Sequence, residues 1–109
     1  MKRYMFRNSE GLYLNTDYHS SARKGKWRSR EDARLYKSIP GIVAAFRAAT
    51  PAVKRCLGVT WKAPPFGQRW TDSDRDASRA LWQGFSKLSA KKKLALWAED
   101  GYTIEEVEV

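Results

Sequence analysis

A polar tetrad at residues 8–11, Asn-Ser-Glu-Gly, separates two short runs of aromatic and large apolar residues. One run covers residues 4–7 and the other covers residues 12–14. Two such runs joined by a short polar segment that contains glycine are typical of a β-hairpin. We therefore expect two antiparallel strands at the start of the chain.

Helix-start signals occupy the next part of the sequence. Ser38 precedes an apolar pattern of helical spacing, and Pro40 stands in its first turn, where a missing N–H group costs nothing. Thr50 and Pro51 begin a second short helix, which Gly58 ends. The sequence therefore predicts two short helices between residues 38 and 58.

Two further helices are predicted after a proline-rich loop at residues 59–70. Ser73 begins the first, whose acidic first turn suits the positive end of the helix dipole. Ser89 begins the second, which Gly101 ends. Apolar residues at helical spacing mark the inward face of each helix: Ala77, Leu81, Phe85 and Leu88 in the first, and Leu94, Trp97 and Ala98 in the second. Each helix is thus expected to pack one face on a core.

Two more strands complete the predicted sheet. Residues 33–37 alternate apolar and basic side chains, which predicts a third strand with Ala33 and Leu35 on one face. Residues 102–109 predict a closing strand, in which two adjacent glutamates break the alternation and indicate a bulge or a short strand. The predicted fold class is α+β. A small antiparallel sheet, made of the N-terminal hairpin, the third strand and the C-terminal strand, packs against three or four short helices in one domain, residues 1–109.

The chain is rich enough in apolar residues to bury a core. It has 109 residues, of which 42% are hydrophobic and 13% are aromatic. The longest purely apolar run, residues 42–46, is far shorter than the roughly 20 residues that a membrane span needs. Charge returns within the first seven residues, before a secretory signal could form. We expect a cytoplasmic protein that does not contact a membrane.

Residues that catalyse reactions or bind metals are few and scattered. The sequence has one histidine, His19, and one cysteine, Cys56. A single cysteine cannot form an intramolecular disulfide, and one Cys with one His is too few for a zinc site. His19 is expected to be a solvated or capping residue, and Cys56 a buried, unreactive thiol. The acidic run at residues 72–76 resembles the start of a calcium loop but lacks the glycine and the final glutamate of that loop. No catalytic residue, metal site or cofactor is predicted.

Positive charge dominates all but the last part of the sequence. The net charge is +9, and residues 1–93 contain 21 Lys and Arg but only seven acidic residues. Residues 94–109 contain five acidic residues and no Lys or Arg. A cationic surface attracts polyanions and speeds their encounter. The expected partners are therefore DNA, RNA or an acidic protein surface. The alternative is that the positive charge only keeps the protein soluble.

The densest cluster of charge lies at residues 23–30, where five cations accompany one tryptophan. Lysine and arginine bind phosphates, and unpaired bases stack on aromatic rings, so this combination suits nucleic acid. The candidate binding residues of this basic segment are Arg23, Lys24, Lys26, Trp27, Arg28 and Arg30. The alternative is a solvated loop in which the Trp27 ring folds back onto the core.

Two other segments supply candidate contacts to a partner. These contacts are Lys91, Lys92, Lys93, Trp61, Arg69 and Trp70. The three lysines form a basic run on the fourth predicted helix, where a charged run can also be only a solvated face. The other three residues lie in the proline-rich loop, and tryptophan and arginine dominate the binding energy of protein interfaces. Burial of the two tryptophans beneath the loop is the alternative.

The first 46 residues resemble a pattern that recurs in short phage-encoded proteins. In that pattern a Tyr-x-x-Arg-Asn strand leads through a glycine turn to Tyr-Leu, and Gly-x-Trp, an Ala-Arg-Leu-Tyr strand and a serine-capped helix follow. The matching residues are Tyr4, Arg7, Asn8, Gly11, Tyr13, Leu14, Gly25, Trp27, Ala33, Arg34, Leu35, Tyr36 and Ser38. The segment at residues 101–104 also resembles the way such proteins end, whereas residues 50–98 have no counterpart in the pattern.

The resemblance implies an accessory phage product that binds and disables machinery in the bacterial host, as anti-CRISPR inhibitors of bacterial immunity do. Many such inhibitors are acidic DNA mimics, whereas this chain is cationic. It would therefore act on an acidic protein surface, on guide RNA or on target DNA. The leading hypothesis is a non-enzymatic inhibitor that binds a host protein or ribonucleoprotein complex through basic and aromatic residues.

Two alternatives to the inhibitor hypothesis stay open. The first is a plain nucleic-acid-binding accessory protein. The second is a ribonuclease toxin of the RelE type, which is also basic, compact and α+β. That enzyme class would need positioned Lys, Arg and Tyr residues for acid–base chemistry, and residue types alone do not distinguish it.

Overall fold

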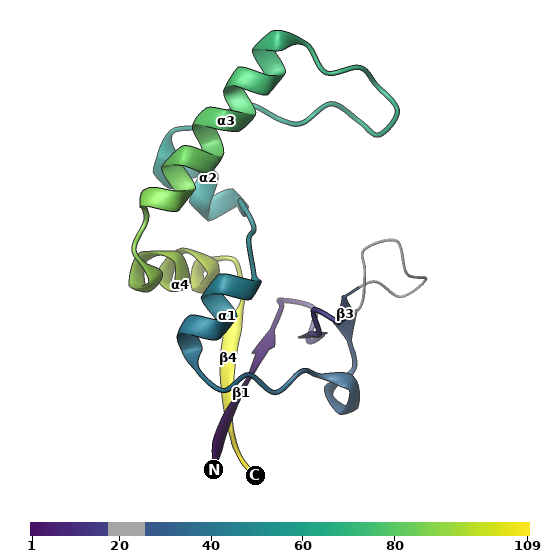
Figure 1. Cartoon of the computed structure of the whole chain (residues 1–109), viewed down its shortest axis with the longest axis vertical. Coiled ribbons are helices and arrows are strands. Elements are labelled where there is room, and N and C mark those ends of the chain that lie inside the picture. Colours follow the sequence, from purple (N-terminus) through teal and green to yellow (C-terminus); the bar gives the residue numbers. More distant parts are fainter. Residues whose placement is uncertain (18–25) are drawn as a thin grey trace.

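The computed structural model describes residues 1–17 and 26–109 (Figure 1). These residues form one sheet and four α-helices, so the predicted α+β fold class is confirmed. Along the chain the elements are β1 (Lys2–Arg7), β2 (Tyr13–Leu14), β3 (Trp27–Arg28), the short 3-10 helix η1 (Arg30–Asp32), α1 (Ile39–Ala45), α2 (Pro51–Leu57), α3 (Asp72–Lys87), α4 (Ala90–Glu99) and β4 (Thr103–Glu108).

The strands form an antiparallel sheet in the order β3-β2-β1-β4. β1 and β4 pair over their whole length, from Lys2 opposite Glu108 to Arg7 opposite Thr103. The register is continuous through residues 105–106, so β4 is a regular strand of six residues. The adjacent glutamates therefore change the side-chain pattern of the strand without changing its backbone pairing.

The predicted N-terminal hairpin is confirmed, and Asn8 organises its turn. The Asn8 side-chain oxygen accepts hydrogen bonds from the backbone N–H groups of Glu10 and Leu12 at 3.0 and 2.9 Å. Gly11 adopts a φ of 82°, a conformation that glycine reaches at little cost. The tetrad thus supplies both the side-chain acceptor and the glycine that a tight connection requires.

The third strand lies earlier in the chain than the sequence predicts. Residues 33–37 contribute a single bridge, between Tyr36 and Tyr4, whereas β3 pairs with β2. The predicted inward face, with Ala33 and Leu35, is also wrong, because Tyr36 is the buried residue and Leu35 is 44% exposed. An alternating pattern defines two faces without stating which one is buried. Burial of the tyrosine ring removes the larger apolar area from water.

Side-chain caps begin most of the helices, and one of them differs from the prediction. Ser38 and Ser89 cap α1 and α4 as expected. Helix α3 starts earlier than predicted, with Thr71 rather than Ser73 as its N-cap. The Thr71 hydroxyl accepts a hydrogen bond from the N–H of Asp74 at 3.1 Å, and the Asp74 carboxylate accepts one from the N–H of Thr71 at 2.9 Å. This reciprocal capping box satisfies two N–H groups, which explains the earlier start.

Aromatic rings fill the core between the sheet and helices α1 and α4. Phe6, Phe46 and Trp97 are each at most 2% exposed. The ring centroid of Phe46 lies 4.9 Å from that of Phe6 and 4.8 Å from that of Trp97. The Trp97 indole N–H donates a hydrogen bond to the carbonyl of Ala48 at 3.2 Å. The polar edge of this buried ring is therefore satisfied.

Two burial predictions on the helices are wrong. Ala98, predicted to share the inward face of α4 with Leu94 and Trp97, is exposed, and Leu96 is buried instead. Helix α4 contacts both α1 and α2, so its buried surface is wider than a single stripe. Cys56 in α2 is exposed rather than buried. Helix α2 buries Ala52 and Val53 near its start, and Cys56 lies one turn later, where the helix is exposed.

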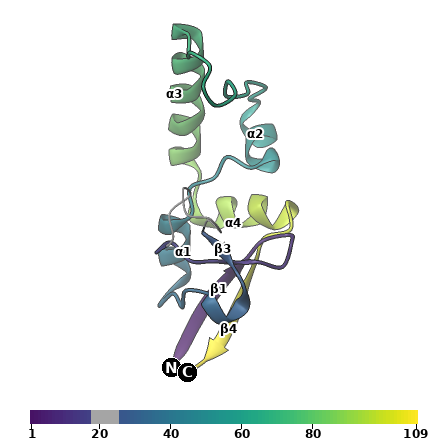
Figure 2. The same ribbon diagram turned by 90° about the vertical axis from the view of Figure 1, so that its right-hand side faces the viewer.

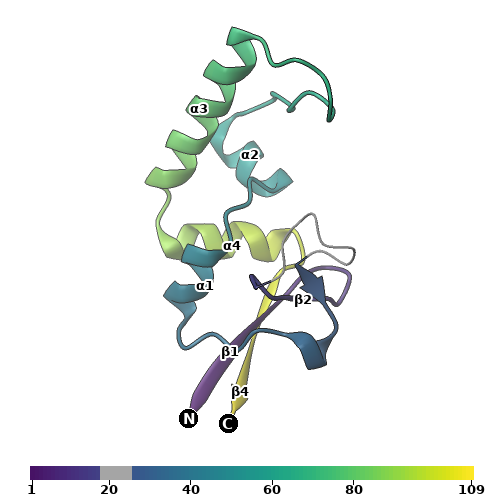
Figure 3. The same cartoon turned by 45° about the vertical axis from the view of Figure 1, so that its right-hand side comes forward.

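The molecule is elongated, with extents of 48 × 32 × 20 Å. The sheet lies at one end with α1, and α2, α3 and the loop of residues 58–71 form the other end, with α4 between them (Figures 1, 2 and 3). Gly84 allows α3 to approach α2, because a β-carbon there would lie 3.3 Å from Leu57 Cδ2. Among the described helices, none is long and apolar enough to cross a membrane.

Candidate nucleic-acid interface

A cleft of about 390 Å³ opens between the 58–71 loop, α3 and the segment that joins α1 to α2. Three tryptophans line it: Trp61 and Trp70 from the loop and Trp82 from α3. The other lining residues are Arg47, Ala48, Ala49, Lys54, Ala63, Ser78 and Leu81. None of these lining residues, all from the described part of the chain, is acidic. We call this site the tryptophan cleft.

Trp61 is fixed in the cleft by contacts on two sides. Its indole N–H donates a hydrogen bond to Asp74 Oδ1 at 3.0 Å. Its ring packs edge-to-face against Trp70, with centroids 5.5 Å apart. The hydrogen bond from Trp61, followed by those from Thr71, lowers the pKa of Asp74 below its ordinary value. The loop is thus attached to the first turn of α3 by an ionised carboxylate.

Trp82 and Arg47 form another part of the cleft lining. The guanidinium carbon of Arg47 lies 5.1 Å from the centroid of the Trp82 ring, a cation–π contact. Trp82 also packs edge-to-face against Phe85, with centroids 5.4 Å apart. Within the described residues, neither Arg47 nor Lys54 lies within ion-pair distance of a carboxylate. The cleft therefore combines aromatic walls with two cations whose charge is not neutralised by an ion pair.

A second hollow, of about 630 Å³, shares Trp82 with the tryptophan cleft. Its other lining residues are Arg79, Gln83, Ser86 and Lys87 on α3. Arg79 pairs with Asp76 at 3.6 Å, but both side chains are exposed, so solvent screens the pair. We call the tryptophan cleft and this hollow together the α3 surface. Flat apolar rings and several cations on one surface can bind a ligand that combines planar groups with negative charge.

Of the three candidate residues in the proline-rich loop, the structure brings two into the cleft. Trp61 and Trp70 are half-buried and line it, so each ring both packs against its surroundings and borders the open space. Arg69 lies outside the cleft, in a neighbouring hollow of about 370 Å³. That hollow also contains Arg75, which pairs with Asp72 at 2.7 Å. Arg69 is therefore at the edge of the α3 surface rather than in its centre.

The Trp27 ring of the basic segment packs on the core. Its centroid lies 5.7 Å from that of Phe46 and 5.9 Å from that of Tyr102. The alternative interpretation, in which this ring folds back onto the core, therefore describes its position. Arg23 and Lys24 lie outside the described residues.

The remaining cations of the basic segment have contacts within the protein. Lys26 Nζ lies 5.7 Å from the centroid of an aromatic ring of the core. The Arg28 side chain is only 13% exposed and pairs with Asp32 at 3.6 Å. Arg30 pairs with Glu105 on β4 at 2.8 Å. The described part of this segment therefore presents less available positive charge than its sequence suggests.

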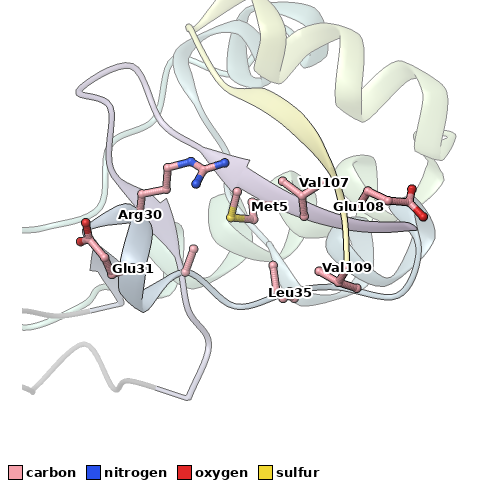
Figure 4. A pocket seen from close by; sticks show the side chains of 8 residues that line it. Met5, Arg30, Glu31, Leu35, Val107, Glu108 and Val109 are labelled. Atoms are coloured by element: carbon pink, nitrogen blue, oxygen red, sulfur yellow. The ribbon is translucent and has the colours of Figure 1, made fainter. Parts of the chain in front are cut away.

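Arg30 also borders a hollow of about 500 Å³ on the sheet face that carries the Met5 side chain (Figure 4). Glu105, on the same face, accepts hydrogen bonds from Arg30 at 2.8 Å and from the Tyr13 hydroxyl at 2.7 Å. Arg30, and then Tyr13, lowers the pKa of Glu105, while the bond to Glu105 raises the pKa of Tyr13. Both pKa values are shifted away from neutral pH, whereas a group that acts as an acid or base catalyst at neutral pH needs a pKa close to that pH. The two hydrogen bonds join η1 and β2 to β4.

The three lysines of the run on α4 differ in exposure and in their contacts. Lys91 and Lys92 are exposed in the first turn of the helix. Lys93 is half-buried, and its Nζ lies 4.4 Å from the centroid of the Phe85 ring. Lys87, which lines the second hollow, is at the end of α3 and close to this turn in sequence. Lys91 and Lys92 thus extend the positive charge beyond the end of α3.

Sequence reasoning missed three residues of the cleft: Arg47, Lys54 and Trp82. The available signal was Trp82, which follows Leu81 and so lies beside the predicted apolar stripe rather than in it. Arg47 lies in the connection between α1 and α2, and Lys54 lies within α2; neither belongs to a sequence pattern of its own. In the described part of the chain, no group of His, Cys, Asp and Glu could hold a metal ion.

No known protein family, curated protein or solved structure matches this chain. The tryptophan cleft is the feature in which charge, aromatic rings and shape coincide.

Proposed function

We propose that this protein is a non-enzymatic binding protein of the bacterial cytoplasm that binds nucleic acid in a host nucleoprotein complex through the α3 surface. The tryptophan cleft is the observation that carries the proposal. It has three tryptophans and two cations among its lining residues and no acidic residue among them. A ligand with planar apolar groups and regularly spaced negative charge matches both properties.

Nucleic acid matches these properties better than an acidic protein surface does. Phosphates satisfy arginine and lysine, and release of their counterions favours binding. Bases stack on aromatic rings and on guanidinium planes. An acidic protein would use the cations Arg47 and Lys54, but it would not require three indole rings in one cleft.

The inhibitor and the plain accessory protein share this surface and differ in the protein component of the partner. The resemblance of the first 46 residues to phage accessory proteins favours the inhibitor. The cationic field of residues 1–93 suits the approach to a nucleoprotein complex. We therefore propose a host nucleoprotein complex, rather than free nucleic acid, as the main partner.

The ribonuclease hypothesis receives no comparable support. Tyr13, Glu105 and Arg30 are a cluster of the residue types that such an enzyme uses. The shifts in the pKa of Tyr13 and Glu105 oppose proton transfer at neutral pH, and the cluster lies away from the α3 surface. Loss of colony growth on expression, with cleaved mRNA, would favour the enzyme.

The proposal is tested by affinity capture from bacterial lysate, with one half of the lysate treated with nuclease. We expect nucleic acid among the captured material, and host proteins that are retained through it and reduced by nuclease. A variant with Arg47→Gln and Lys54→Gln should capture less of both. Capture of the same proteins at the same level after complete nuclease digestion would contradict recognition of nucleic acid and would favour an acidic protein surface.

A further inference from the structure

We infer that the tryptophan cleft selects an unpaired base, so that the ligand of the α3 surface is single-stranded rather than duplex nucleic acid. This inference rests on the proposed function and adds the form of the nucleic acid that is bound. The cleft would take one base between the loop tryptophans and Trp82. Arg47 and Lys54 would bind phosphates adjoining that base.

The arrangement of the rings supports an unpaired base. Trp61 and Trp70 come from the loop and Trp82 comes from α3, so a group that enters the cleft meets indole rings from two elements of the fold. A base in a duplex has both faces covered by its neighbours and cannot enter such a space without leaving the stack. An unpaired base has free faces, and its transfer from water onto an aromatic ring is favourable.

The small residues of the cleft provide the space. Ala48, Ala49 and Ala63 line it together with Ser78, so four of its ten lining residues have short side chains. Leu81 is 2% exposed and closes the apolar interior. The volume of about 390 Å³ lies within the range of pockets that bind small organic groups, about 300–1,000 Å³. The cleft therefore has the volume for one planar group.

The rings are held before a ligand arrives. The hydrogen bond from Trp61 to Asp74 and the edge-to-face contact with Trp70 fix the loop side of the cleft. Arg47 over Trp82 holds a guanidinium group at the α3 side. A preorganised site loses less conformational entropy on binding than a flexible one.

The test compares two fluorescent oligomers of about ten nucleotides, a length within the site size of single-strand-binding proteins. One is oligothymidylate, and the other has the same backbone and charge but abasic sugars throughout. We expect the wild-type protein to bind oligothymidylate about 5- to 150-fold more tightly, the factor that stacking of one base provides. A duplex of the same length should bind less tightly than oligothymidylate at the same salt concentration.

Trp82→Leu serves as the site variant, because leucine keeps apolar packing but removes the flat ring. We expect this variant to lose most of the preference for oligothymidylate over the abasic oligomer and to keep its affinity for the abasic oligomer. Trp70→Leu tests the loop side in the same way if Trp82→Leu does not fold. The comparison of the two oligomers on the wild-type protein needs no variant.

Three outcomes distinguish this inference from the proposed function. Equal binding of both oligomers by the wild-type protein would overturn the base site while leaving recognition of nucleic acid intact. Tighter binding of the duplex than of oligothymidylate would also overturn it. Failure to bind any of these nucleic acids, with binding of a glutamate-rich peptide, would overturn both proposals in favour of an acidic protein partner.

Discussion

The indole N–H of Trp61 donates a hydrogen bond to Asp74 Oδ1 at 3.0 Å and so attaches the 58–71 loop to the first turn of α3. The other oxygen of the same carboxylate accepts hydrogen bonds from the backbone N–H and the hydroxyl of Thr71, both at 2.9 Å. One side chain therefore supports a wall of the tryptophan cleft and the start of a helix. A substitution of Asp74 should therefore destabilise both the loop and the start of α3.

We predict that Asp74→Asn lowers the melting temperature at neutral pH, because the amide lacks the second acceptor oxygen that Thr71 uses. The folded protein holds the pKa of Asp74 below its ordinary value of 3.8. The stabilising effect of the carboxylate is therefore fully present above pH 3.8 and is lost as the pH falls toward the lowered pKa. Thermal melts of both proteins from pH 7 downward should show the difference in melting temperature shrinking below that value. A difference that stays constant over this range would contradict the account.

Gly101 should tolerate a side chain less well than Gly58, although both have a positive φ, of 90° and 68°. A β-carbon at Gly101 would lie 2.7 Å from Ser9 Cβ, whereas one at Gly58 would meet nothing within 4 Å. We expect Gly58→Ala to cost about 1–2 kcal/mol, from the left-handed backbone conformation alone. Gly101→Ala should cost about 1–3 kcal/mol more, from overpacking against the hairpin turn.

Urea unfolding of the two glycine variants measures these costs. Ser9→Gly in the Gly101→Ala background removes the nearest contact and should restore part of the lost free energy of unfolding. Equal costs for the two single variants would show that the contact between the helix end and the hairpin turn is not tight.

Trp27→Ala should reduce the free energy of unfolding by about 3 kcal/mol, near the low end of the range for deletion of a large aromatic side chain. The reason is its contact with the rings of Phe46 and Tyr102. Under the same conditions the affinity of the folded variant for oligothymidylate should be close to that of the wild type. Unchanged stability with a clear loss of affinity would instead make Trp27 a stacking platform.

Local chemistry made much of the fold predictable. The hairpin turn around Asn8, the serine caps at Ser38 and Ser89 and the closing strand each depend on residues that are near one another in the sequence. The start of α3 was also signalled locally, since Thr71 and Asp74 form the Thr-x-x-Asp pattern of a capping box. The prediction that α3 begins at Ser73 is therefore wrong although the sequence contains the pattern that marks Thr71 as the N-cap.

The features that could not be predicted depend on contacts between residues that are far apart in the sequence. The position of β3 and the burial of Tyr36 depend on pairing with β2 and β1, which no local pattern encodes. The tryptophan cleft combines Arg47, Lys54 and Trp82 with two loop tryptophans, and only tertiary packing brings them together. The loop tryptophans could be named as candidates because tryptophan dominates the binding energy of protein interfaces, but their common site could not be predicted.

The central claim is tested most directly by the salt dependence of oligothymidylate binding in two charge-matched variants. Arg47→Gln with Lys54→Gln removes both cations of the cleft, while Arg3→Gln with Lys37→Gln removes two cations from β1 and the segment before α1. Each phosphate contact on a single strand contributes about 0.7 to the slope of log affinity against log salt concentration. We predict that the cleft variant flattens this slope by about 1.4 and that the control variant leaves it nearly unchanged. A cleft variant with the wild-type slope and affinity would contradict the binding of nucleic acid at this site.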